Sequence, residues 1–223
     1  MINDQETLNL LLSTVQRFVR ERLIPAEQIV AETDAIPADI VAEMREIGLF
    51  GLTIPEQYGG AGLTMEEEVL VTLELTYTSP AFRLIMGTNN GIGLQGIVID
   101  RTEEQKQTWL PKMASGELIG SFALTEPGTG SDASSVSTSA KLDGDVYVVN
   151  GTQRYITTAP EAGVFTLMGR TDPRTKGAGG VSALVLDAKT AGIQIGKTDK
   201  KWASAVPIRP MSFSTTCVCR LPI

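Results

Sequence analysis

Residues 125–132, with the sequence TEPGTGSD, gather glycines and hydroxyl side chains in one short stretch. Gly128 and Gly130 permit positive φ angles and leave backbone N–H groups uncovered by side chains, and a turn of this kind can bind an anion. Thr125 and Ser131 add hydroxyl groups that both donate and accept hydrogen bonds. The stretch therefore predicts a turn that holds a polar or anionic ligand, with an ordinary loop of turn-forming residues as the alternative.

A second candidate stretch, residues 153–157 with the sequence QRYIT, closes a run of strand-forming residues. Tyr155, Ile156 and Thr157 supply an aromatic ring, an apolar side chain and a hydroxyl group. An aromatic face beside hydroxyl groups suits a flat heteroaromatic ring with polar edges. Considered alone, Tyr155 is more typical of a core or strand-pair aromatic residue, so the prediction depends on the two stretches meeting.

The composition of the 223-residue chain excludes several other chemistries. The chain has no histidine, which excludes Ser-His-Asp, Cys-His and His-metal sites. Its net charge of −7 argues against nucleic acid or an anionic membrane as the main partner. No apolar run approaches the roughly 20 residues that a membrane span needs, and the N-terminus does not resemble a signal peptide. The two cysteines, Cys217 and Cys219, fit a reducing compartment.

The first half of the chain predicts helices. Apolar residues at spacings of three and four run through residues 6–32, with an interruption at Pro25. A second helix should end at Gly48, and Thr64 and Thr102 should cap the start of later helices. The predicted helical stretches are 6–32, 37–48, 64–80, 88–101 and 102–117.

After Gly116 the sequence changes to short runs of β-branched or alternating residues, which predict strands. These runs are residues 119–125, 135–143, 146–157, 163–171 and 181–188. Turn pairs Asp143-Gly144 and Asn150-Gly151 should separate strands. The prediction is an α+β chain, with an all-α domain over residues 1–118 and a small antiparallel β domain over residues 119–201.

Several motifs in continuous order resemble the acyl-CoA dehydrogenase family. LTEPGTGSD at residues 124–132 is similar to the family's Leu/Val-Thr-Glu-Pro-x-x-Gly-Ser-Asp motif. The flanks agree, with TEEQKQTWLPKMASGELIGSFA at 102–123 and DGDVYVVNGTQRYIT at 143–157, and so does IPEQYGGAGLT at 54–64. The resemblance covers residues from about 5 to 201.

The resemblance implies a flavoenzyme that binds FAD and oxidises the Cα–Cβ bond of an acyl-CoA thioester to the trans-2-enoyl-CoA. A carboxylate removes the α-proton, and the β-hydrogen leaves as a hydride to the flavin. Electrons then pass to an electron-transfer flavoprotein. The family fold has an N-terminal helical domain, a middle β-barrel and a C-terminal helical domain, and its members are homotetramers or dimers. The bacterial cytoplasm is the expected location, with the mitochondrial matrix as the alternative, because the chain lacks an Arg-rich presequence.

Carried over position by position, the resemblance implies a set of cofactor-binding residues. These are Phe122, Leu124, Thr125, Gly130, Ser131, Tyr155, Ile156 and Thr157. Thr125 would bond a polar ring edge, Ser131 would also lie near the CoA portion of the substrate, and Thr157 would bond near the flavin N5. Tyr155 stands where the family most often has Trp, and Thr158 stands where Asn often follows.

No residue of the chain matches the family's catalytic carboxylate, which lies in the C-terminal helical domain, so we assign no catalytic base. Glu126 lies beside the candidate turn, but the family does not use this position for proton abstraction. We therefore expect Glu126 to support the loop structure. The chain as a whole resembles the N-terminal and middle domains of a longer enzyme.

Residues 202–223, with the sequence WASAVPIRPMSFSTTCVCRLPI, differ from the family pattern. Plausible codons for this tail, with one nucleotide restored before Trp202, give a family-like sequence in another reading frame. We therefore expect an aberrant tail produced by a frameshift, with a lineage-specific tail as the alternative. On this interpretation the β domain is incomplete, it loses its last strands, and a sheet edge remains unpaired. The reading frame after Lys201 in the gene decides between the two.

Two other functions fit parts of the sequence. A flavin monooxygenase or nitroalkane oxidase-like relative would share the scaffold, and a non-catalytic flavin-binding fragment would explain the missing base. We expect the chain by itself to bind FAD weakly and to lack dehydrogenase activity. Acyl chain length cannot be read from the sequence, because one methylene changes discrimination by only about 1–3 kcal/mol.

Overall fold

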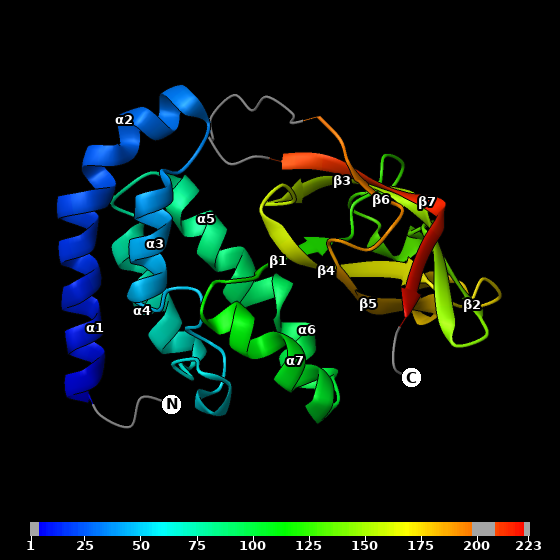
Figure 1. Cartoon of the computed structure of the whole chain (residues 1–223), viewed down its shortest axis with the longest axis horizontal. Coiled ribbons are helices and arrows are strands. Elements are labelled where there is room, and N and C mark those ends of the chain that lie inside the picture. Colours follow the sequence, from blue (N-terminus) through cyan, green and yellow to red (C-terminus); the bar gives the residue numbers. More distant parts are fainter. Residues whose placement is uncertain (1–4, 198–207, 221–223) are drawn as a thin grey trace. The chain divides into compact units, whose positions relative to one another are not determined.

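The structure is a computed structural model that describes residues 5–197 and the strand at 208–220. The described chain forms two compact units, a helical unit up to Ile119 and a β unit from Gly120 onward (Figure 1). Each unit has a hydrophobic cluster of its own. The two units are therefore described one after the other.

The first helical segment contains a break where the sequence predicts one. Helix α1 (Gln5–Phe18) continues into a π-helical turn, η1 (Val19–Leu23), and then into α2 (Ile24–Thr33). Pro25 lies in the first turn of α2, where its missing N–H and its ring are tolerated. The wider π-helical turn precedes the proline, so the expected interruption at Pro25 is confirmed.

The predicted helix ends and caps are also confirmed. Helix α3 (Ala38–Glu46) is followed by Gly48 at a φ of +82°, a conformation that favours glycine. Thr64 caps α4 (Met65–Leu75) in a capping box with Glu67. Thr102 caps α7 (Glu103–Ala114) with Gln105 in the same way.

Two predicted helices have the wrong bounds. The helix expected over residues 64–80 ends at Leu75, and a separate helix, α5 (Pro80–Thr88), begins after the N-cap Ser79. The helix expected over 88–101 is broken by a π-helical segment, η3 (Asn89–Gly93), before α6 (Gln95–Asp100). The break contains Gly91, whose φ of −95° and ψ of −114° are not helical.

Buried side chains of these helices form the core of the helical unit. Helix α1 packs against α4, and α6 packs against α7. The fully buried side chains include Leu23, Met44, Phe50, Leu75, Phe82 and Met86. Two buried amides hold the break at η3: Asn89 donates to Phe50 O at 2.8 Å, and Asn90 donates to Leu49 O at 2.7 Å. Among the described residues, no helix is long and apolar enough to cross a membrane.

Within the described residues, the β unit is one sheet with a strand in each of the five predicted regions and two more strands; in the region predicted over 135–143 the strand begins only at Ser139. Its strands are β1 (Ile119–Ala123), β2 (Ser139–Asp143), β3 (Val146–Thr157), β4 (Ala162–Arg170), β5 (Val181–Asp187), β6 (Ile193–Ile195) and β7 (Ile208–Arg220). Within the described residues the strand order is β1-β4-β2-β3-β7-β6, and β5 pairs with β4. This sheet is open, so the closed barrel that the family resemblance implied is wrong in that detail.

Two further expectations about the sheet need correction. Asn150-Gly151 does not separate strands but lies inside β3, at a shift of register against β7. The pairing is not wholly antiparallel, because Ser139 of β2 and Arg170 of β4 pair in parallel. The turn at Asp143-Gly144 is confirmed, with Gly144 at a φ of +64° between β2 and β3.

The tail also differs from its expected structure. Residues 208–220 form β7, which pairs antiparallel with β3 from Val146↔Arg220 to Thr157↔Ile208 and also pairs with β6. The edge of β3 is therefore paired rather than exposed, and the loss of the last strands is not observed for this part of the tail. Residues 202–207 and 221–223, which the same expectation included, lie outside the described residues.

Candidate functional site

The loop after β1 is closed by a short two-residue bridge. The backbone N–H of Glu126 donates to Thr129 O at 2.9 Å, and the N–H of Thr129 donates to Glu126 O at 3.1 Å. Pro127 and Gly128 form the exposed tip between them. The sequence EPGT thus makes a tight turn, as its Pro-Gly pair predicts.

The two glycines of this loop leave backbone N–H groups uncovered, as predicted, without using a left-handed conformation. Neither Gly128 nor Gly130 has a positive φ, so the positive φ that glycine permits is not used at either position. A Cβ added to either residue would meet no atom within 4 Å. The space beside these two glycines is therefore not filled by other described residues, and one side of the loop is accessible. The N–H groups of Gly130 and Ser131 make no hydrogen bond within the described part of the chain.

Backbone hydrogen bonds bring the loop and the end of β3 together. The N–H of Arg154 donates to the carbonyl oxygen of Thr125 at 2.6 Å. The hydroxyl of Ser121, on β1, donates to the carbonyl oxygen of Thr157. The two stretches that the sequence singled out, 125–132 and 153–157, are therefore adjacent.

Tyr155 lies in a β-bulge with a left-handed backbone. Gln153 pairs with Met211 and Ile156 pairs with Arg209, so that two residues of β3 oppose one residue of β7. The φ of Tyr155 is +59°, which is unfavourable for a non-glycine residue. Tyr155 is 56% exposed, and the Arg154 guanidinium carbon lies 5.0 Å from the centroid of its ring. The bulge turns this aromatic side chain outward, as bulges commonly do at functional sites.

The other predicted site residues differ in exposure. Phe122, Leu124, Thr125 and Thr157 are half-buried, whereas Gly130 and Ser131 are exposed. The hydroxyls of Thr125, Ser131 and Thr157 make no hydrogen bond to any residue that the structure describes. The side chain of Ile156 is only 1% exposed and packs in the core cluster of the β unit. Ile156 can therefore contact a ligand only through its backbone.

Glu126 is a buried carboxylate that four donors surround. It is 5% exposed and accepts from Ser137 N at 2.8 Å, from Thr138 N at 2.6 Å, from the Ser137 hydroxyl and from Gln153 Nε2 at 3.3 Å. Burial raises the pKa of Glu126, but the hydrogen bonds from Ser137 and Thr138 outweigh it, so the pKa lies below its ordinary value. A carboxylate so held is a poor proton acceptor. The expectation that Glu126 supports the loop is confirmed.

Asp132, the last residue of the motif, also has a structural role. It caps a short 3-10 turn (Ala133–Ser135), where it accepts from Ser134 N at 3.2 Å and from the hydroxyls of Ser134 and Ser135. These bonds lower the pKa of Asp132. The serine run after the motif therefore fixes the far end of the loop.

The residues that hold the site from behind were not predicted from the sequence. Gln153 is fully buried; its Nε2 donates to Thr138 Oγ1 at 2.8 Å, and its Oε1 has no hydrogen-bond partner among the described residues. A Cβ on Gly151 would lie 2.7 Å from the Thr138 Cβ, so only glycine fits there. A polar Gln in the middle of a strand was the available signal, but nothing in the sequence shows which residues it meets.

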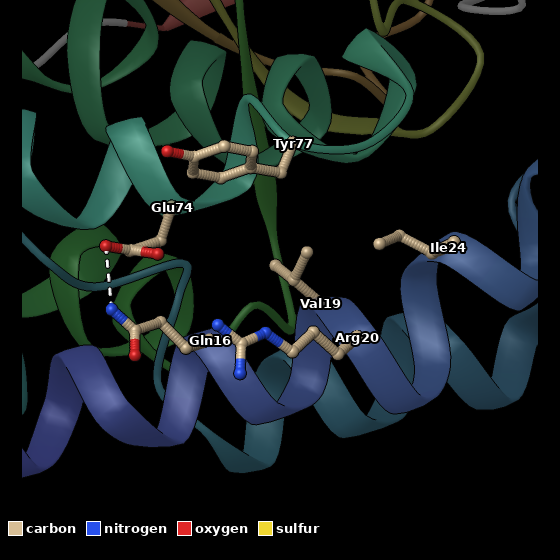
Figure 2. Close-up of a pocket in the computed structure, with 6 residues that line it drawn as sticks. All are labelled: Gln16, Val19, Arg20, Ile24, Glu74 and Tyr77. Carbon is tan, nitrogen blue, oxygen red and sulfur yellow. Dashed lines mark hydrogen bonds between the residues drawn. The ribbon is translucent and has the colours of Figure 1, made fainter.

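A separate hollow of about 340 Å³ lies in the helical unit (Figure 2). Its lining residues are Gln16, Val19, Arg20, Ile24, Glu74 and Tyr77. Gln16 Nε2, on α1, donates to Glu74 Oε1, on α4, at 2.9 Å (Figure 2). None of the predicted site residues lines this hollow. Among the described residues, no group of three or more Cys, Asp or Glu is placed to hold a metal ion.

Comparison with known proteins identifies the two units. The family description "Acyl-CoA dehydrogenase, N-terminal domain" matches residues 5–117, and "Acyl-CoA dehydrogenase, middle domain" matches residues 121–216. The second match extends past Lys201, so the expectation that likeness to the family ends there is wrong for residues 202–216. The proposed frameshift in the gene stays a prediction.

Similar proteins agree with these matches. The human mitochondrial short-chain specific acyl-CoA dehydrogenase is 37% identical over 219 residues, which are 97% of this chain and 52% of that protein. An acyl-CoA dehydrogenase structure from Geobacillus kaustophilus has a TM-score of 0.90 at 31% identity and covers 98% of this chain and 58% of that one. A Bacillus anthracis acyl-CoA dehydrogenase complexed with FAD has a TM-score of 0.85 at 27% identity, over 97% of this chain and 37% of that one. The chain spans about half the length of the curated relatives that it matches, and it belongs to the acyl-CoA dehydrogenase family.

Proposed function

We propose that this chain forms the helical and middle parts of an FAD-dependent acyl-CoA dehydrogenase. The observation that carries the proposal is the 2.6 Å hydrogen bond from Arg154 N to Thr125 O, which joins the open loop to the outward-turned Tyr155. The loop offers N–H and hydroxyl groups that are unpaired within the described part of the chain, and the bulge offers an exposed aromatic face. Together they form one wall of a site for a flat ring with polar edges.

The residues present fit a flavin dinucleotide. The hydroxyls of Thr125 and Thr157 have no protein partner among the described residues, so each is available to a polar edge of the isoalloxazine ring. Tyr155 would pack on the ring through its exposed face. Gly130 and Ser131 would meet the phosphates or the CoA portion through N–H groups that make no hydrogen bond to a described residue. Because a Cβ at Gly130 would meet no atom within 4 Å, the room there is sufficient for close approach of a ligand.

The residues of this chain bind and orient rather than transfer protons. FAD, when bound, supplies the acceptor for the β-hydrogen of the acyl-CoA, and we propose the trans-2-enoyl-CoA as the product. Tyr155 and the Thr125 loop would hold the ring and exclude water from one face. Glu126 cannot serve as the base, because it is buried and saturated with hydrogen bonds. The base would come from the C-terminal helical domain of the family, and an electron-transfer flavoprotein would take the electrons.

A flavin titration of the purified chain tests this proposal. We expect FAD to bind weakly, with quenching of its fluorescence, because the chain supplies one wall of the site. Tyr155→Leu should weaken binding by about tenfold, since stacking on one aromatic ring contributes about 1–3 kcal/mol. Tyr77→Leu removes a tyrosine that is 75% exposed in the helical unit and is the matched control.

The same titration separates the proposal from its alternatives. FAD binding is then combined with an anaerobic test of the chain joined to a C-terminal helical domain of the family. If an acyl-CoA bleaches the bound flavin of that assembly, the dehydrogenase is supported. If FAD binds without bleaching by any acyl-CoA in that assembly, a non-catalytic flavin-binding role is supported instead. If Tyr155→Leu and Tyr77→Leu bind FAD as the wild type does, the proposed wall is wrong.

A further inference from the structure

The buried network behind the loop has more hydrogen bonds than a turn of four residues needs. Glu126 is 5% exposed, yet it receives N–H groups from two consecutive residues, Ser137 and Thr138, that lie eleven and twelve residues further along the chain. It also accepts a hydrogen bond from Gln153 Nε2, on β3. One carboxylate therefore ties together the loop, the start of β2 and the end of β3.

This network lies directly behind the proposed flavin wall. Thr125, whose hydroxyl is offered to the flavin, precedes Glu126. Arg154 and Tyr155, which form the bulge, follow Gln153. The hydrogen bond from Arg154 N to Thr125 O therefore lies next to the Glu126–Gln153 contact, one residue away in the loop and one residue away in β3. Both halves of the wall are therefore bonded, directly or through the next residue, to the groups that hold the carboxylate.

The charge of Glu126 matters as well as its shape. Within the described residues, all its partners are neutral donors, namely two backbone N–H groups, one hydroxyl and one amide. A glutamine at this position would have the same size but would turn an NH₂ group toward donors. Hydrogen bonds to a charged acceptor are also stronger than neutral ones. An isosteric amide should therefore loosen the network even though the packing is unchanged.

We propose that Glu126 is a positioning residue of the flavin site, which fixes the Thr125 loop against the Tyr155 bulge through Ser137, Thr138 and Gln153. The flavin part of this inference rests on the proposed function. The positioning part does not, because the Arg154–Thr125 hydrogen bond exists without a ligand. The two parts can therefore be tested separately on the same full chain.

Hydrogen exchange of the Arg154 amide tests the positioning part. In Glu126→Gln we expect this amide to exchange at least about tenfold faster than in the wild type, the effect of losing roughly one charge-assisted bond. Amides of the β4–β5 pair should keep their protection, which shows that the β unit remains folded. Asp145→Asn, at an exposed carboxylate in the turn between β2 and β3, is the matched control. It should change neither the exchange rate of the Arg154 amide nor the protection of the β4–β5 amides.

A flavin titration of the same variants tests the second part. Glu126→Gln should weaken FAD binding at least about tenfold, and the milder Ser137→Ala, which removes one hydroxyl donor, should weaken it less. The double variant Glu126→Gln with Gln153→Glu restores one carboxylate to the pair and should recover part of the affinity. Arg154 exchange equal to that of the wild type in Glu126→Gln would overturn the positioning role. If the wild type binds no FAD while Arg154 responds, the proposed function fails and the positioning of the loop stands.

Discussion

Thr138 packs so closely over Gly151 that a Cβ on Gly151 would lie 2.7 Å from the Thr138 Cβ and 2.8 Å from its Cα. Real Cβ contacts are not this short, so one of the two strands would have to move. The approach of Thr138 lets its hydroxyl accept from Gln153 and its N–H donate to Glu126. A glycine in the middle of β3 is thus required by the buried network behind the site.

Gly151→Ala should therefore destabilise the β unit by about 1–3 kcal/mol, the usual cost of overpacking. Gly128→Ala is the matched control, because its Cβ would meet no atom and its φ is not positive. It should be neutral or stabilising by up to about 1 kcal/mol. Urea unfolding of the two variants measures both values. Equal stability of Gly151→Ala and the wild type would contradict the close contact.

Tyr155 should be a site where function costs stability. Its φ of +59° is tolerated better by asparagine than by an aromatic residue. Tyr155→Asn should raise the free energy of unfolding by about 0.5–1 kcal/mol while it weakens FAD binding. Tyr147→Asn, on the same strand without a positive φ, should lower the stability instead. If both substitutions destabilise the protein equally, the backbone of Tyr155 carries no strain.

The stability contributed by Glu126 should depend on pH. Its pKa is lower in the folded protein than in the unfolded chain, where it is about 4.3. The contribution is therefore complete above that value and is lost as the pH falls through the lowered pKa. The difference in unfolding free energy between the wild type and Glu126→Gln should be largest above about pH 5 and should shrink toward pH 3. A difference that stays constant over this range would show that Glu126 does not titrate as described.

The capping box of α4 offers a test in the helical unit. Thr64 Oγ1 accepts from Glu67 N at 3.3 Å, and Glu67 Oε2 accepts from Thr64 N at 2.7 Å. Thr64→Ala should cost about 1 kcal/mol. Thr72→Ala, in the middle of the same helix, should cost nothing, because alanine is the better helix former. Thermal unfolding followed by circular dichroism compares the two, and an equal loss would argue against the cap.

The sequence predicted the features of the fold that depend on neighbouring residues. The stop of α3 just before Gly48, the caps at Thr64 and Thr102, and the Asp143-Gly144 turn each depend on local propensity, and each is confirmed. The break at η3 was missed, because the apolar residues on both sides continue the helical spacing. That break is held by Asn89 and Asn90, which bond to carbonyls about 40 residues away.

The candidate site was predictable in its location but not in its geometry. The motifs at 125–132 and 153–157 meet as expected, because both have strong local signals. Gly128 and Gly130 do not use the positive φ that glycine permits, whereas Tyr155, a residue that rarely adopts it, has one. The β-bulge that produces it depends on the pairing of β3 with β7, a strand that the sequence did not predict.

The central claim is that the Thr125 loop and the Tyr155 bulge form one flavin-binding wall, and amide NMR of the full chain during a titration with FAD tests it most directly. We predict that the amides of residues 125, 130, 131 and 155–157 shift together along one binding curve, and that Tyr155→Leu weakens that curve. Shifts confined to other residues, or no shifts in either stretch at saturating FAD, would contradict it.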